Sequence, residues 1–313
     1  MAHMKYDKTH EPETTIWRDL YTRQWADLIT PAAREHPAKY ARLLIKKIYN
    51  HAFDEGWIEK GDYVLDPFAG VALGAVDAMA YGLNWTGVEI EQQWVSAGNE
   101  NIKKWVDSYR QFTNMVGKAI IVKGAAQDIT RKPNVTGYQL AIGSPPFLQS
   151  RGGAKVLGGK DDAFMARHGA GNRGVAAYGA TPGQLHNLPI GTIRGAKFKD
   201  EPETYWDAAL KIATRVYNVL EPGGHAIWVV KDYVENAKRR PFTRDWRRIC
   251  EKAGFRTVCI HNASVIKHVA SSFDESMEIS TTISERKSTF RRMAEKKGAP
   301  RIDEEVVICM AKL

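Results

Sequence analysis

Short apolar runs alternate with longer amphipathic segments along most of the chain. The apolar runs predict buried strands at residues 62–66, 84–90, 119–122, 138–142, 225–230, 256–261 and 305–310. The amphipathic segments predict helices at residues 40–49, 71–81, 91–109, 202–220 and 241–253. Because strands alternate with helices, the pattern predicts an α/β protein with a mostly parallel, seven-stranded sheet and helices on both faces.

Two stretches interrupt this alternation. Residues 148–200 are rich in glycine and in basic side chains, and residues 264–303 separate the last two predicted strands. A structureless loop of such length is uncommon in a compact domain unless it has a function. We therefore expect one domain, residues 36–313, with a functional insertion at 148–200 and a basic insertion at 264–303.

Residues 1–35 are expected to form an N-terminal extension. Its first residues, 1–3, look like the remnant of a purification tag. Trp17, Tyr21 and Trp25 are spaced by four, which predicts three rings on one face of a helix that docks on the core.

The formal net charge of +9 favours a polyanionic partner, although many soluble proteins are basic without binding nucleic acid. Cys250, Cys259 and Cys309 are far apart in the sequence, and two of them lie in apolar, strand-like runs. This usage suits buried thiols in a reducing cytoplasm better than disulfides, and we expect no metal site. No apolar run approaches the ~20 residues that a membrane-spanning helix needs.

A ligand site is expected where the first strand of the sheet ends, at Asp66-Pro67-Phe68-Ala69-Gly70. Gly70 lets the backbone approach a ligand closely. The loop lacks the glycine pattern that binds a pyrophosphate, while Glu89, about 20 residues on, can accept hydrogen bonds from ribose hydroxyls. Together they indicate a ligand with a ribose and no phosphates. Taken singly, the loop could be a routine strand-to-helix turn and Glu89 a solvated strand end.

Two further motifs complete a resemblance to a known family. Gly87-Val88-Glu89-Ile90 and Ser144-Pro145-Pro146-Phe147, with the loop at Asp66, resemble the amino-methylating DNA methyltransferases, which comprise the N4-cytosine and N6-adenine enzymes. The resemblance covers about residues 36–260. It implies a Rossmann-like class I methyltransferase fold and S-adenosylmethionine as cofactor. The cofactor-binding residues that it implies are His36, Pro37, Lys39, Asp66, Pro67, Phe68, Ala69, Gly70, Glu89, Ile90, Asp128 and Ser144.

The chain departs from the family pattern near the end of the third strand. The family often has Gly-Asp there, whereas this sequence reads Gly124-Ala125-Ala126-Gln127-Asp128. Asp128 either takes the place of the family's acid beside the adenine or is a surface cap. Backbone groups could also read the adenine edge.

Ser144, Pro145, Pro146 and Phe147 are the candidate catalytic residues. The amino group of a base is a poor nucleophile, and the Ser144 hydroxyl with the nearby carbonyls can hold its two N–H bonds. The prolines fix these acceptors in advance, and Phe147 offers a face for an extruded base. The alternative is a rigid surface turn, because Ser-Pro commonly starts one.

The resemblance implies methylation of double-stranded DNA in the cytoplasm of a prokaryotic or phage-infected cell, as in restriction–modification. Serine at the first motif position is commoner in N4-cytosine enzymes, so N4-methylcytosine is the favoured product. Methylation of adenine N6, or of a base in structured RNA, remains open. So do an inactive DNA-binding protein and a small-molecule methyltransferase. C5-cytosine chemistry is disfavoured, since no cysteine follows a proline. The candidate DNA-binding residues are Arg151, Arg173, Arg286, Lys287, Arg291 and Arg292.

Overall fold

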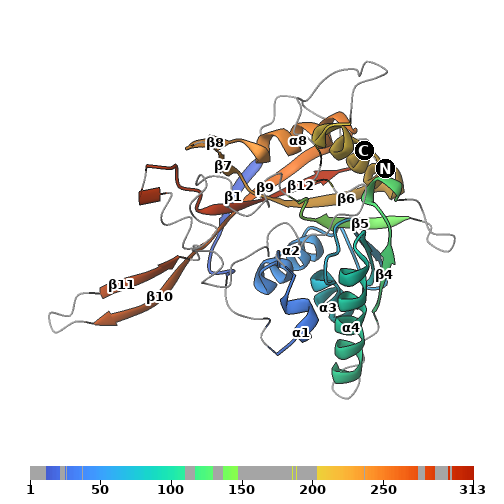
Figure 1. The fold of residues 1–313 in the computed structure, drawn as a ribbon, viewed down its shortest axis with the longest axis horizontal. Helices are drawn as coiled ribbons and strands as arrows, with labels where there is room; N and C mark the ends of the chain where they lie inside the picture. The colour runs from blue at the N-terminus through green and yellow to red at the C-terminus, as the bar shows by residue number, and fades with distance from the viewer. Residues whose placement is uncertain are drawn as a thin grey trace, which may run out of the picture.

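The computed structural model describes residues 12–21, 25, 27–36, 38–109, 117–129, 137–146, 185, 188, 203–235, 237–273, 279–285, 295–296 and 298–313. Their main feature is one large sheet (Figure 1). Its strands are β1 (Glu13–Trp17), β2 (Tyr63–Asp66), β3 (Asn84–Glu89), β4 (Lys118–Lys123), β5 (Tyr138–Gly143), β6 (Leu220–Val230), β9 (Arg256–Ser264) and β12 (Glu304–Ala311).

The strand order is β1-β9-β12-β6-β5-β2-β3-β4. Neighbouring strands run parallel except at β12, which is antiparallel to both β9 and β6. The predicted α/β, Rossmann-like fold is thus confirmed. The predicted number of strands was wrong, because the sheet is mixed and has eight strands rather than seven.

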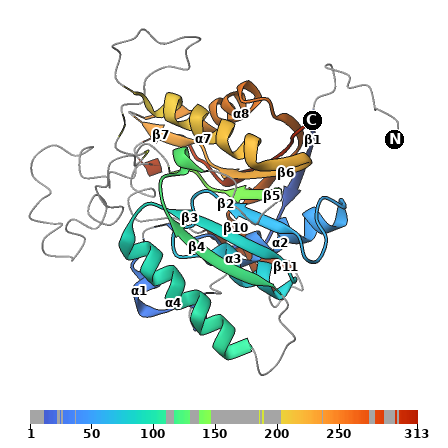
Figure 2. The same ribbon diagram turned by 90° about the vertical axis from the view of Figure 1, so that its right-hand side faces the viewer.

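Helices cover both faces of the sheet. The described helices are α1 (Pro31–Arg34), α2 (Arg42–Asp54), α3 (Leu73–Ala80), α4 (Gln92–Tyr109), α7 (Tyr205–Val219), α8 (Phe242–Lys252) and the short 3₁₀ helix η1 (Ala126–Asp128). Figures 1 and 2 show α2, α3 and α4 on one face, with α7 and α8 on the other. Each face has its own buried apolar cluster. The strands between them read as continuous apolar runs because they are buried on both sides.

The eighth strand, β1, comes from the N-terminal extension, where we had predicted a helix. Its sequence, Glu-Thr-Thr-Ile-Trp, contains β-branched and aromatic residues that favour an extended chain. Trp17 and Tyr21 are buried, as the spacing suggested, but they reach the core from a strand and the turn after it. Three aromatic residues spaced by four were therefore too few to establish a helical period.

Two small antiparallel ribbons accompany the sheet. One pairs β7 (Tyr233–Glu235) with β8 (Lys238–Arg240), and the other pairs β10 (Ile266–Phe273) with β11 (Ile279–Glu285). The second lies in the insertion 264–303 and projects away from the sheet (Figure 1). None of the helices in the described ranges has the length and apolar character that crossing a membrane requires.

The basic run at β8 and α8 is partly neutralised by acidic neighbours. Arg239 pairs with Asp232 (2.7 Å), and Arg240 pairs with Glu235 (2.9 Å). Arg247 on α8 pairs with Glu251 (2.7 Å). This surface therefore offers less positive potential than its sequence suggests.

Candidate cofactor and acceptor site

A cavity of about 420 Å³ lies at the carboxyl ends of the parallel strands. Ligand sites in proteins have volumes of roughly 300–1,000 Å³. The cavity opens beside β2, where the chain order reverses: β3 and β4 lie on one side of β2, and β5 and β6 lie on the other. Ligands bind at this switch point in open α/β sheets. Residues that follow β2, β3, β4, β5 and β6 all contribute to the cavity wall.

The loop after β2 forms one wall of the cavity, through Pro67, Phe68, Ala69 and Gly70. Asp66 was predicted to bind the cofactor, but it is buried beneath the loop and is not among the residues that line the cavity. Its Oδ1 accepts a hydrogen bond from the backbone N–H of Phe68 (2.9 Å). Burial raises the pKa of Asp66 to about 7. In this structure Asp66 shapes the loop rather than contacting the cavity.

Gly70 combines two constraints. Its φ of +51° lies in the left-handed region, and a Cβ at this position would lie 3.2 Å from two atoms of the His36 ring. The loop is also fixed from behind by Asn101 of α4, a fully buried residue whose Nδ2 donates to the Val71 carbonyl (2.8 Å). Asn101 could not be predicted from the sequence, because a lone asparagine on a helix carries no signal of its tertiary partner.

The segment before α2 supplies a second wall through His36 and Lys39. Nδ1 of His36 lies 2.5 Å from the Ala38 carbonyl. The Lys39 ammonium donates to the carbonyls of His36 and Arg34. Burial lowers the pKa of His36 to about 4, so its ring is neutral at physiological pH. Pro37, also predicted to bind the cofactor, lies outside the described residues.

Glu89 closes the cavity at the end of β3. Its Oε2 accepts from the Gly70 N–H (3.0 Å), and its Oε1 accepts from the Glu91 N–H (2.9 Å). These bonds fix the carboxylate beside the loop, and a carboxylate, with about four acceptor sites, can still accept a further hydrogen bond. Burial raises the pKa of Glu89 to about 7, although the backbone hydrogen bonds oppose that rise. The predicted ribose acceptor and its neighbour Ile90 both line the cavity.

The cavity wall also contains side chains that were not predicted, among them Trp94 and Gln127. Trp94 of α4 lies edge-on to His36, with ring centroids 4.8 Å apart. Gln127 lines the cavity, whereas its neighbour Asp128, the predicted adenine-side acid, does not. The short helix η1 turns the chain just after β4. The sequence alone therefore could not tell which of the two neighbours, Gln127 or Asp128, faces the cavity.

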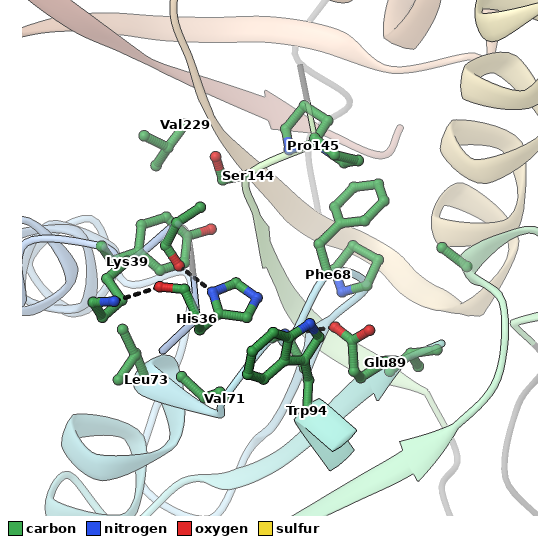
Figure 3. A pocket seen from close by; sticks show the side chains of 18 of the residues that line it. His36, Lys39, Phe68, Val71, Leu73, Glu89, Trp94, Ser144, Pro145 and Val229 are labelled. Atoms are coloured by element: carbon green, nitrogen blue, oxygen red, sulfur yellow. Dashed lines mark hydrogen bonds between the residues drawn. The ribbon is translucent and has the colours of Figure 1, made fainter. Parts of the chain in front are cut away.

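The acceptor motif follows β5 and faces the same cavity. Ser144, Pro145 and Pro146 line it, and Phe147 lies outside the described residues. Figure 3 shows Ser144 and Glu89 on opposite sides, with Phe68 above Glu89. The Tyr205 hydroxyl donates to the Pro146 carbonyl (2.9 Å), so α7 holds the motif in place.

Tyr40 is an unpredicted neighbour of Ser144. Burial, followed by the charge of Asp66, raises the pKa of Tyr40 well above its usual value, and the Ser144 hydroxyl opposes the rise. The Tyr40 hydroxyl is buried and makes no hydrogen bond of ordinary geometry with the described residues. A second hydroxyl thus lies beside the predicted acceptor.

The predicted DNA-binding side chains Arg151, Arg173, Arg286, Lys287, Arg291 and Arg292 lie outside the described residues. Of the insertion 148–200, the structure describes Leu185 and Leu188. Leu185 is buried and lines the cavity. The other insertion begins at the cavity as well, because Val265, between β9 and β10, belongs to the wall.

The donor set of this cavity fits S-adenosylmethionine. Glu89 presents a carboxylate of the kind that accepts from ribose hydroxyls. Apolar side chains such as Phe68 and Ile90 border it and can flank an adenine ring. His36 and Lys39 place neutral and cationic nitrogens at the other end of the loop, suited to the methionine part.

The fold defines the class of protein: the described residues have a Rossmann-like methyltransferase fold, with a cavity at the ligand-binding edge of the sheet. Residues 2–119 match a family model, of the N6/N4 methyltransferases, that is described as DNA methylase. This match supports a DNA amino-methyltransferase, and it contains the cofactor loop and Glu89. The acceptor motif at Ser144 lies beyond the matched residues. No curated protein matches the chain.

Solved structures with a similar fold are mostly methyltransferases of low sequence identity. TrmN from Thermus thermophilus is 11% identical with a TM-score of 0.44; the alignment covers 90% of this chain and 52% of TrmN, so the chain spans about half of that protein. Magnesium protoporphyrin IX methyltransferase from Synechocystis is 8% identical, with a TM-score of 0.45 and coverage of 93% and 88%. A putative RNA methyltransferase from Pyrococcus horikoshii is 10% identical, with a TM-score of 0.42 and coverage of 91% and 90%.

Gly70→Ala is expected to weaken cofactor binding about tenfold, a cost of about 1.4 kcal/mol. The new methyl group would press on His36, and a non-glycine residue disfavours the left-handed conformation. Gly56→Ala is a matched control, because Gly56 has a φ of +69° with nothing within 4 Å of the added Cβ. Calorimetric titration with S-adenosylmethionine should separate the two variants. Equal affinities would contradict a role for Gly70 in shaping the cofactor loop.

Proposed function

We propose that the protein transfers the methyl group of S-adenosylmethionine to the exocyclic N4 amino group of a cytosine that is flipped out of duplex DNA. The observation that carries this proposal is the position of Ser144. Its motif lies at the end of β5, next to β2, and lines the same cavity as the candidate ribose acceptor Glu89. A cofactor site and an acceptor site that share one cavity can bring a methyl donor and an amino group together without a covalent enzyme intermediate.

In this proposal the chain holds and orients its two substrates. Glu89 accepts hydrogen bonds from the ribose hydroxyls, and Gly70 fixes Glu89 through its backbone N–H. Ser144 accepts an N–H of the target amino group, which turns the nitrogen lone pair toward the cofactor. When bound, S-adenosylmethionine supplies an electrophilic methyl group on a sulfonium.

The rigidity of the acceptor loop is part of the proposed mechanism. Pro145 and Pro146 restrict the backbone, and Tyr205 engages the Pro146 carbonyl from α7. Acceptors that are positioned before the base arrives need no reorganisation during the reaction. Phe147 is assigned the stacking of the extruded base.

The choice of cytosine rests on Ser144, because serine at this position is commoner among the N4-cytosine enzymes that the motifs resemble. The main alternative is adenine N6. The same acceptor geometry suits both amino groups, so an experiment has to separate them.

Binding of the duplex is assigned to the two insertions. The ribbon of β10 and β11 begins one residue after Val265 of the cavity wall, and the Val265 N–H donates to the Asp303 carbonyl where the insertion ends (2.8 Å). A two-stranded ribbon can enter a DNA groove. The proposed phosphate contacts are Arg286, Lys287, Arg291 and Arg292 from this insertion, with Arg151 and Arg173 from the other.

The test is to incubate the chain with duplex DNA of random sequence and S-adenosylmethionine that carries a deuterated methyl group. The DNA is then digested to nucleosides, which are separated by chromatography against standards and weighed. We expect the label in N4-methyldeoxycytidine. Chromatography is needed because the N4- and C5-methylated nucleosides have the same mass.

A label in any other product would overturn a different part of the proposal. Label in N6-methyldeoxyadenosine would replace the base assignment and keep the enzyme class. Label in 5-methyldeoxycytidine would overturn the amino-group mechanism. Label only in structured RNA would overturn the DNA assignment. Tight DNA binding without cofactor binding would indicate an inactive DNA-binding protein. Single-molecule sequencing of the methylated pool would identify the sequence context of the target base.

A further inference from the structure

We propose that the protein has a structural zinc site outside the cofactor cavity, made by His51, Cys259, His261 and Cys309. One ligand-type atom from each residue lies within 4.8 Å of all the others. Cys259, His261 and Cys309 are buried, and His51 is half-buried. None of the four lines the cavity described above.

The fold brings these residues together from one helix and two neighbouring strands. Cys259 and His261 are two residues apart on β9, so their side chains lie on the same face of the sheet. Cys309 on β12 is the backbone partner of Cys259 in the antiparallel ladder. His51 reaches the same place from α2, which covers this face. No short sequence motif contains this combination, which is why the cysteine spacing predicted no metal site.

The distances suit a tetrahedral ion. Nε2 of His51 lies 3.4 Å from the Cys259 sulfur and 3.1 Å from Nε2 of His261, which is 3.2 Å from the Cys259 sulfur. Zn–N and Zn–S bonds of about 2.0 and 2.3 Å place the ligand atoms of a tetrahedron about 3.3–3.8 Å apart. The three measured separations therefore need to widen only slightly to admit the ion.

Both imidazoles are oriented as metal ligands usually are. Each directs Nε2 into the cluster, while Nδ1 faces an oxygen atom on the outside. Nδ1 of His261 lies 2.6 Å from the Thr15 hydroxyl of β1, and Nδ1 of His51 lies 3.9 Å from the Glu55 carboxylate. The Thr15 hydroxyl is at hydrogen-bond distance and fixes the His261 ring, as the outer partners of metal-bound histidines do, whereas the Glu55 carboxylate lies beyond hydrogen-bond distance of His51.

The surroundings favour a closed, structural site for Zn²⁺. Two thiolates would balance the charge of the divalent ion, so the buried assembly would be neutral. The indole of Trp17 stacks on His261 at 4.1 Å, and Trp57 lies edge-on to His51 at 5.0 Å. Four protein ligands leave no open position for a reacting water. The chemical class of ligand is a borderline-soft divalent cation, and two sulfurs with two imidazoles select zinc.

The primary test is elemental analysis of the full chain, purified without a polyhistidine tag and without added metal. We expect about one zinc per chain. The double variant C259A/C309A should lose this zinc. Cys250→Ala is the matched control, because Cys250 is a fully buried cysteine of α8 outside the cluster, and this variant should keep the metal.

Two measurements keep the proposal testable if the double variant fails to fold. Stepwise blocking of the thiols of the unaltered chain with a mercurial reagent should release zinc to a colorimetric indicator. Replacement by Co²⁺ should give the intense visible bands of a tetrahedral cobalt thiolate. The proposal fails if the reduced chain neither contains zinc nor binds added Zn²⁺ or Co²⁺ in unit stoichiometry. It also fails if the double variant retains the metal, or if iron occupies the site instead.

Discussion

Ser144→Ala is expected to lower kcat about 100-fold while S-adenosylmethionine binds as tightly as before. Ser144 lies on the acceptor side of the cavity, on the opposite side from Glu89 (Figure 3). Loss of one positioned hydrogen-bonding group at a reacting centre typically costs about 10²–10³ in rate. The measurement is single-turnover transfer of labelled methyl to saturating duplex DNA, with calorimetry of the cofactor in parallel.

Ser96→Ala is the control for this experiment, because Ser96 is an exposed serine of α4 away from the cavity. It should retain full activity. If Ser144→Ala turned over as fast as the unaltered chain, Ser144 could not be the acceptor of the amino group. If it lost cofactor affinity instead, the effect would belong to the cavity as a whole.

Glu89→Gln is expected to weaken S-adenosylmethionine binding about 30-fold, since a charge-assisted hydrogen bond is worth roughly 2 kcal/mol. The variant keeps the shape of the side chain but replaces the negative oxygens that would meet the ribose hydroxyls. Calorimetric titration measures the change. Glu100→Gln, on the exposed side of α4, is the matched control and should bind the cofactor normally.

The pH dependence of S-adenosylmethionine affinity tests whether the ionised carboxylate of Glu89 binds the ribose. Its pKa is raised to about 7 in the folded chain, and hydrogen bonds from the ribose favour the ionised carboxylate. Affinity should therefore be full above pH ~7 and fall, by up to about tenfold per pH unit, as the pH drops below the pKa. Glu89→Gln should remove this slope. A slope that persisted in the variant would assign the titration to another group, such as the buried Asp66.

The sequence predicted those parts of the fold that depend on local patterns. From Asp62 onward each expected strand and helix is present, because buried parallel strands give uninterrupted apolar runs and the helices between them are amphipathic. The N-terminal strand was missed, since three aromatic residues spaced by four suggested a helix, and the five residues of an edge strand form too short a pattern to oppose that interpretation.

The residues of the candidate site also differ in whether the sequence could predict them. Gly70 and Glu89 could be placed in advance because each lies at a strand end in a recurring motif. Tyr40, Trp94 and Tyr205 could not, because they reach the cavity or its loops from helices and connections that carry no motif. The cluster of His51, Cys259, His261 and Cys309 was the hardest to predict, because its geometry depends on the register between β9 and β12.

The pairing of β1 with β9 has a consequence for how the molecule is assembled. Thr15 and its contact His261 are 246 positions apart in the sequence. During synthesis β1 therefore stays unpaired until β9 has left the ribosome. Closing so long a loop is slow, and until then the edges of both strands are open to wrong partners. The pairing of β1 with β9 is thus expected to form late in folding.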